Sequence, residues 1–194
     1  MESFLYICNM KCWRRLIRWC RGIGHGKGFG IQSPFAYDIV TTVINQSSPY
    51  YAYERLAREY PLTAAQQKDC RLLFRLANFL QPQGIGVSDT ITRRCLSSPL
   101  FRAMLAHLQA GCRRSVVRDL RAANDLVLLT AASYQEQIRL TSVHSVVVIC
   151  EIDHEDAWRA LLSRPDVTFS FELYRLCILF FDTNFHHRHY LINY

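Results

Sequence analysis

The sequence predicts an α/β domain with a mostly parallel sheet, preceded by a helical N-terminal extension. Helical periodicity dominates residues 1–80, whereas short β-branched runs alternate with helical stretches from residue 84 onwards. Strands that alternate with helices form crossover units, and crossover units build a parallel sheet. The last two runs, residues 167–173 and 175–181, have too short a gap for a crossover, so they predict an antiparallel strand pair.

The composition is that of one folded domain. The chain has 194 residues, half of them hydrophobic and a fifth charged, which argues against an intrinsically disordered protein. No apolar run approaches the roughly 20 residues of a membrane-spanning helix, and the N-terminus lacks the charge and long apolar core of a secretory signal. We therefore expect a cytoplasmic protein whose eight scattered cysteines, with no C-x-x-C pair, are reduced and structural.

The N-terminal extension, residues 1–80, is predicted to consist of helices joined by loops. An apolar stripe with helical spacing runs through residues 12–20, and a glycine-rich loop ends this first helix. Helix restarts after Ser33, which can act as an N-cap and is followed by proline. Two further helices follow, separated by Pro61, and Thr63 can cap the second of them.

The core, residues 81–194, is predicted to be a shortened sheet that forms one structural unit with the extension. Six β-branched runs predict its strands: 84–87, 115–120, 125–129, 144–150, 167–173 and 175–181. Helical stretches near 100–111, 133–142 and 155–163 alternate with the first several of these runs. No internal repeat and no separate second domain is evident.

Positive charge is concentrated near the N-terminus. The net charge is +7, and residues 1–30 contribute +5 of it through six lysines and arginines against one glutamate. Four arginines lie on the face of the predicted first helix that is opposite its apolar stripe: Arg14, Arg15, Arg18 and Arg21. A packed amphipathic helix with a solvated arginine face explains them, and contact with an anionic membrane surface, a nucleic acid or an acidic partner is the alternative. No nucleic-acid-binding motif accompanies the charge.

Four segments together carry a family resemblance. They are GIQSPFAYDIV (30–40), YYAYE (50–54), LLFRLANFLQP (72–82) and AWRALLSRPDVTFSFELYRLCILFF (157–181). In this order they resemble a bacterial branch of the class I methyltransferases that use S-adenosylmethionine. The resemblance covers roughly residues 10–92 and 144–194. It implies a Rossmann-like sheet with a C-terminal antiparallel strand pair, and S-adenosylmethionine as cofactor.

The resemblance implies a cofactor site in the loop after the first predicted strand. In such enzymes an E-x-G-x-x-x-G-type loop holds the amino-acid end of the cofactor through backbone groups. The matching candidates here are Gly84, Gly86, Val87 and Ser88, but Gly84 replaces the acidic residue and Thr90 replaces the second glycine. A branched side chain at that second position should crowd the ligand. A short glycine-containing turn is also what an ordinary strand-to-helix connection uses.

The other chemical positions of the family are altered along the same edge. The resemblance implies an acid that holds the ribose hydroxyls at the end of the next strand. Asp119 suits the start of the following strand better, so this acid is expected to be missing. Asp125 keeps its place in a D-L-V-type strand and is a candidate cofactor contact, whereas Thr130 replaces the acid that ends that strand. Cys150 and Glu151 stand where two aspartates are expected, which leaves Glu151 as the candidate general base.

A histidine-rich segment near the C-terminus raises the question of a metal site. His187 and His189 would share one face of a strand, and His154 or Asp182 could supply a third ligand. No ligand spacing typical of zinc is present, and an exposed loop explains the histidines. We therefore predict no metal site.

Two functions remain open at this point. The first is methyl transfer from S-adenosylmethionine to an unidentified acceptor, driven mainly by proximity and orientation. The second is a non-catalytic relative, a pseudoenzyme that kept the scaffold and acts through its basic first helix or an exposed sheet edge. The altered residues favour the second. A pocket faced by Ser88 and Asp125 would favour the enzyme, and an edge filled by Leu96, Phe101 or Tyr134 would favour the pseudoenzyme.

Overall fold

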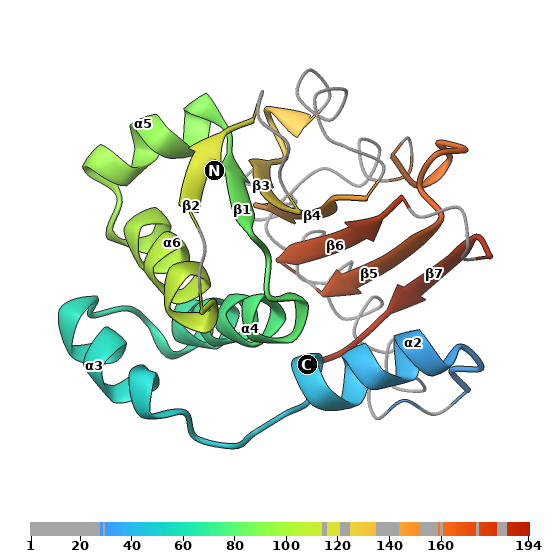
Figure 1. Cartoon of the computed structure of the whole chain (residues 1–194), viewed down its shortest axis with the longest axis horizontal. Helices are drawn as coiled ribbons and strands as arrows, with labels where there is room; N and C mark the ends of the chain where they lie inside the picture. Colours follow the sequence, from blue (N-terminus) through green and yellow to red (C-terminus); the bar gives the residue numbers. More distant parts are fainter. Residues whose placement is uncertain are drawn as a thin grey trace, which may run out of the picture.

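A seven-stranded sheet with helices packed on it forms the body of the protein, so the predicted α/β class with a Rossmann-like, mostly parallel sheet is confirmed (Figure 1). A computed structural model describes residues 28, 30–113, 116–120, 125–134, 144–151, 159, 161–173, 175–181 and 186–194. The predicted first helix, and most of the helices expected at 133–142 and 155–163, lie outside these residues.

All six predicted strands are present, and the sheet order is β2-β1-β3-β4-β6-β5-β7. The strands are β1 (Gly84–Val87), β2 (Val116–Asp119), β3 (Leu126–Thr130), β4 (Val146–Cys150), β5 (Phe169–Leu173), β6 (Leu176–Phe180) and β7 (Arg188–Leu191). Strands β2, β1, β3 and β4 run parallel to one another, whereas β6 runs antiparallel to both β4 and β5. The predicted antiparallel pair is therefore confirmed as β5 and β6.

Strand β7 was not predicted, because its polar residues hide the alternation that marks a strand. It pairs in parallel with β5 at the end of the sheet, and Tyr190 lies opposite Phe171. Tyr190 is buried and stacks on the Phe171 ring with centroids 5.8 Å apart. His189 points to the other face, where its Nδ1 is 2.9 Å from the Ser170 hydroxyl. A histidine-rich segment that was expected to be a loop thus ends the sheet.

The central strands are buried on both faces, which explains their nearly continuous apolar runs. In β3, Leu126 and Leu128 belong to one hydrophobic core, and Val127 and Leu129 belong to a second core across the sheet. The first core also contains residues of the helices that precede β1. Because side chains of a strand alternate between faces, each apolar run supplies both cores.

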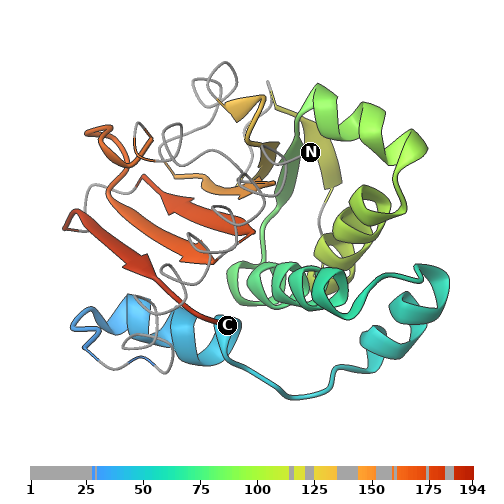
Figure 2. The same ribbon diagram turned by 180° about the vertical axis from the view of Figure 1, so that it is seen from behind.

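The helices before and after β1 contribute buried residues to the first core, except the helix Tyr51–Glu59, whose buried residues pack with Phe74 in a separate small cluster. They are α2 (Pro34–Asp38), the π-helix η1 (Ile39–Ile44), α3 (Tyr51–Glu59), α4 (Ala64–Leu80), α5 (Asp89–Ser97) and α6 (Pro99–Gly111). Ser33 and Thr63 act as N-caps as predicted, and Thr63 forms a capping box with Gln66. Helices α4 and α6 lie side by side in both views (Figures 1 and 2). A Cβ atom at Gly111 would lie 2.3 Å from the Phe74 carbonyl oxygen, so only glycine permits this close approach.

A buried carboxylate ties α4 to the far end of the chain. Asp69 accepts hydrogen bonds from Arg175 through Nε (2.6 Å) and Nη2 (2.9 Å). The Tyr194 hydroxyl donates to the same carboxylate. Arg175 lies in the turn between β5 and β6, and Tyr194 follows β7. Asp69 therefore connects the helical extension, the antiparallel pair and the C-terminal residues.

Replacing this carboxylate should weaken the whole domain. We expect Asp69→Ala to lower the free energy of unfolding by about 2–3 kcal/mol, less than for a fully buried pair because the Arg175 side chain remains partly in solvent. Urea unfolding measures the change. Glu54→Ala is the control, because it removes an exposed ion pair with Arg58 and should change stability by less than about 0.5 kcal/mol. Equal effects of the two variants would contradict the role given to Asp69.

A second stability prediction concerns His107, which is buried on α6. Burial lowers the pKa of His107, while a hydrogen bond to the Ala103 carbonyl oxygen (2.7 Å) opposes this. In the unfolded chain the His107 imidazole binds a proton below about pH 6.5, whereas in the folded chain it binds this proton only at lower pH. The free energy of unfolding should therefore fall as pH drops below that value. In His107→Gln the fall between pH 7.5 and 5 should be smaller, and an unchanged slope would contradict the assignment.

Candidate functional site

The carboxyl ends of the parallel strands form the edge at which open α/β sheets bind ligands. Strands β1, β2, β3 and β4 end at Val87, Asp119, Thr130 and Cys150. Val87 pairs with Asp119 on one side and with Leu128 on the other. Any cofactor bound as the family resemblance implies would contact the segments that follow these residues.

The segment predicted to be a cofactor loop is reduced to one residue. Strand β1 ends at Val87 and helix α5 starts at Asp89, so Ser88 alone connects them. Ser88 is fully buried, and its hydroxyl caps α5 by accepting a hydrogen bond from the Ile91 amide (3.2 Å). Its own amide donates to the Leu128 carbonyl oxygen (3.3 Å). The Ser88 amide and an acceptor position of its hydroxyl are therefore used within the protein, and its carbonyl oxygen accepts from the Thr92 amide (2.9 Å).

Gly84 and Asp125 lie at the edge of the sheet opposite to Ser88, so the arrangement that would favour the enzyme, a pocket faced by Ser88 and Asp125, is not seen. The Asp125 carboxylate accepts hydrogen bonds from the amides of Gln83 (2.7 Å) and Gly84 (3.3 Å). Asp125 comes directly before β3, and Gly84 is the first residue of β1. Because β1 and β3 are parallel, both residues lie at the amino edge. Asp125 stabilises the start of β1.

Asp119 is the last residue of β2 rather than part of the connection to β3. It lies beside Val87 in the parallel register, at the carboxyl edge. This is the position at which the resemblance implies the ribose-binding acid, which the sequence analysis expected to be missing. The sequence contains a pattern that would have indicated this position, because residues 116–119 form a short run that begins with two valines and ends in an acid. Strand pairing decides that this acid belongs to β2.

The candidate base Glu151 forms an ion pair with Arg94 of α5. Both side chains are about half exposed, and the Arg94 guanidinium lies 5.1 Å from the Phe101 ring centroid. Glu151 follows β4 and has a φ of 60°, in the left-handed region. The pair bridges from the helix after β1 to the end of β4. A general base must accept a proton, and here the carboxylate is already engaged by a guanidinium.

Two of the residues named as possible fillers of this edge belong to the hydrophobic cores on opposite faces of the sheet. Of the three residues named as possible fillers, Phe101 and Tyr134 are buried, whereas Leu96 is exposed. The hydroxyls of Thr130 and Ser133 lie 2.9 Å apart at the end of β3. Burial raises the pKa of the Cys150 thiol far above its usual value, so this cysteine is not a thiolate nucleophile at neutral pH.

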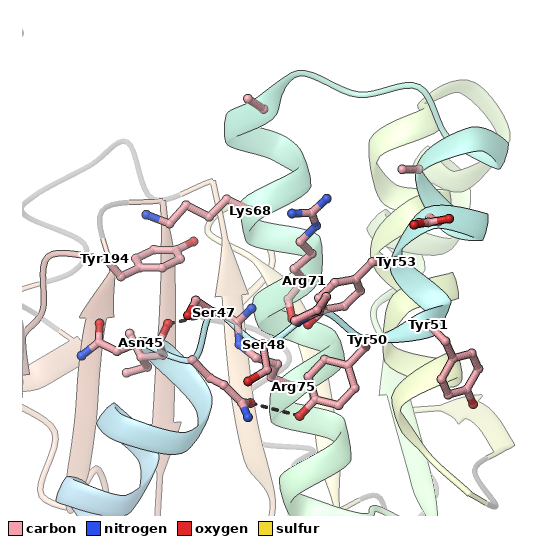
Figure 3. A pocket seen from close by; sticks show the side chains of 16 residues that line it. Asn45, Ser47, Ser48, Tyr50, Tyr51, Tyr53, Lys68, Arg71, Arg75 and Tyr194 are labelled. Carbon is pink, nitrogen blue, oxygen red and sulfur yellow. Dashed lines mark hydrogen bonds between the residues drawn. The ribbon is translucent and has the colours of Figure 1, made fainter.

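A hollow of the described surface lies away from this edge. An open pocket of about 870 Å³ lies between helix α4, helix α3, the segment that joins η1 to α3, and Tyr194 (Figure 3). It is lined by Lys68, Arg71 and Arg75 from α4 and by the tyrosines of the YYAYE segment. The Lys68 side chain extends over the Tyr194 ring, and the Arg71 guanidinium lies beside Tyr53 (Figure 3). The cations of this site could not be assigned from the sequence, because residues 44–57, one face of α4 and Tyr194 meet only in the fold.

Three further sequence predictions concern metal, membrane and the basic helix. Within the described residues, no three histidine, cysteine or acidic side chains are placed to hold a metal. His189 lies 3.4 Å from Glu172, while His154 and Asp182 fall outside the described residues. The described part of the chain also contains no helix with the length and apolar character to span a membrane. Arg14, Arg15, Arg18 and Arg21 lie outside it, so their partner stays a prediction.

The backbone at Glu151 gives a test of this edge. Glu151→Gly and Glu151→Ala both remove the ion pair with Arg94, but only glycine adopts a φ of 60° without steric cost. We expect the glycine variant to be more stable than the alanine variant by about 1 kcal/mol. Chemical denaturation of the two variants measures the difference. An alanine variant of equal or greater stability would show that the backbone at this position is not left-handed.

Comparisons with known proteins add a likeness of fold. No protein-family model matches the chain, and no curated protein sequence matches it. Among solved structures, a methyltransferase from Geobacter sulfurreducens is 18% identical, with a TM-score of 0.38 over 70% of this chain and 93% of that chain. A likeness at this level says nothing about activity.

Proposed function

We propose that this protein is a methyltransferase-like domain whose S-adenosylmethionine site is lost, and that it acts as a non-catalytic binding or structural protein. The observation that carries this proposal is the connection between β1 and α5. A cofactor loop needs backbone groups that are free to meet the ligand. Here a single buried residue, Ser88, makes the connection and uses its amide and hydroxyl to hold β3 and α5.

The electrostatics at the same place support the proposal. Asp89 occupies the first turn of α5, where a carboxylate interacts favourably with the helix dipole. A ligand carboxylate, such as that of the methionine end of the cofactor, would be repelled by this acid. The Arg94–Glu151 pair lies across the ends of β1 and β4, and a ligand there would have to separate it. On this proposal the residues present do not fit the cofactor.

One observation favours a second candidate, the intact enzyme. Asp119 ends β2 beside Val87, where the resemblance implies a ribose-binding acid. An active protein would use this acid to hold the cofactor ribose and Gly86 to allow close backbone approach at the centre of the edge. The methyl acceptor of such an enzyme is not identified by any residue described above.

The non-catalytic protein would interact through surfaces other than the strand ends. We propose the arginine-rich N-terminal segment as one of them, in contact with an anionic surface or an acidic partner. The outer edge of β7 is another, because this strand pairs with β5 on one side and stands at the end of the sheet. Arg188 and His189 are exposed there, and charged residues of this kind limit indiscriminate strand addition.

Calorimetric titration with S-adenosylmethionine and its demethylated product tests the proposal. We expect the folded wild-type protein to bind neither ligand with a dissociation constant below 1 mM, which corresponds to about −4 kcal/mol. Arg94→Ala should bind no better, because Ser88 remains committed to the α5 cap. Micromolar binding by the wild type would contradict the proposal.

The same titration distinguishes the second candidate. If the wild type binds at micromolar concentration and Asp119→Asn weakens that binding tenfold or more, the intact cofactor site is supported and a screen of methyl acceptors follows. Binding by Arg94→Ala alone would show that the ion pair with Glu151, rather than the β1–α5 connection, closes the edge. Circular dichroism of each variant verifies that the protein is folded.

A further inference from the structure

The pocket beside α4 is separate from the strand ends and carries an excess of positive charge. Lys68, Arg71 and Arg75 follow one another at intervals of three and four residues, so they share one face of α4. Among the described residues, no carboxylate lies within ion-pair distance of these three side chains. The acid that lines the pocket, Glu54, is 3.4 Å from Arg58.

The positive charge of Arg75 is held in place by the fold. Its side chain is buried, and its Nε and Nη2 donate to the carbonyl oxygens of Val43 (2.5 Å) and Ile44 (3.2 Å). These carbonyls end η1, so the guanidinium favourably meets the negative end of that helix. Carbonyl dipoles offset a full charge only in part, and a guanidinium has five N–H donors, more than these two bonds use.

The neighbouring carboxylate does not neutralise the pocket. Asp69 lies next to Lys68 on α4, but it is engaged by Arg175 and by the Tyr194 hydroxyl. Burial, and then repulsion from Arg175, lower the pKa of Lys68. An anion bound beside Lys68 would relieve this repulsion. The pocket therefore favours a negatively charged ligand.

Aromatic rings and hydroxyls complete the lining. The Lys68 Nζ lies 4.6 Å from the Tyr194 ring centroid, and the Arg71 guanidinium carbon lies 5.1 Å from that of Tyr53. The Tyr51 side chain is 93% exposed at the rim, which leaves its ring face available to a ligand. Ser47 and Ser48 face α4 across the pocket (Figure 3). A charged group could thus be held by the cations and hydroxyls while a planar group stacks on a tyrosine.

We infer that this pocket binds a phosphate monoester whose molecule also contains a planar ring, such as a nucleoside monophosphate. The side chains of the lining carry a formal charge of +2, from Lys68, Arg71 and Arg75 against Glu54. A phosphate monoester carries a charge of about −1.5 to −2 at pH 7, which matches this excess. Serine hydroxyls and guanidinium groups donate hydrogen bonds to phosphate oxygens, and the tyrosines supply stacking surface for the ring. This inference does not depend on whether the strand-end site binds a cofactor.

Calorimetric titration of the full chain with uridine 5′-monophosphate tests the inference. A pyrimidine probe is chosen because it shares no base with S-adenosylmethionine, so the two sites are tested separately. Uridine 5′-monophosphate should bind with a dissociation constant below 1 mM, and both uridine and inorganic phosphate should bind at least tenfold more weakly. Lys68→Ala and Arg71→Ala should each weaken nucleotide binding at least tenfold.

Arg93→Ala is the matched control, because Arg93 is exposed on α5 and is not among the residues lining the pocket. It removes the same charge and should leave the affinity within twofold of wild type. Three outcomes would overturn the inference. The first is that the folded wild type does not bind the nucleotide at 1 mM. The second is that Arg93→Ala and Lys68→Ala lose equal affinity for the nucleotide, and the third is that inorganic phosphate binds as tightly as the nucleotide. Circular dichroism establishes that each variant is folded.

Discussion

The carboxylate of Asp69 is the interaction on which the arrangement of this protein depends. Helix α4 carries it into the interior, where an isolated charge would be strongly disfavoured. Arg175 and Tyr194 reach it from the β5–β6 turn and from the residues after β7. The contact fixes α4 against the sheet, and α4 in turn holds α6 through the close approach at Gly111. It also fixes Tyr194 as one wall of the cationic pocket.

The strands that the sequence predicts are those marked by residues that are consecutive in the chain. Central strands buried on both faces need β-branched apolar residues at consecutive positions, and six such runs are visible without any structure. Strand β7 needs only Tyr190 on the buried side, because it stands at the end of the sheet. Its polar composition therefore gave no signal. Ser33 and Thr63 were predictable caps because capping depends on residues three positions apart.

The functional edge was harder to predict, because it depends on which strand a residue joins and at which end. Asp119 and Asp125 are six positions apart, yet strand pairing places the first at the carboxyl edge and the second at the amino edge. The pair between Arg94 and Glu151 joins residues 57 positions apart. The cationic pocket combines residues 44–57, one face of α4, and Tyr194. No spacing rule in the sequence relates these segments, so only the fold brings them together.

The distances along the chain from Asp69 to its partners bear on how the protein forms during synthesis. Arg175 lies 106 residues later and Tyr194 lies 125 residues later. While the ribosome is adding those residues, α4 has already left the exit tunnel, and the Asp69 carboxylate cannot yet pair with Arg175. Strand β5 likewise cannot join the sheet before β6 is synthesised, because β6 lies between β4 and β5. Early helices can thus collapse together, but they cannot settle against the sheet until the last quarter of the chain emerges, and they remain a target for chaperones in that interval.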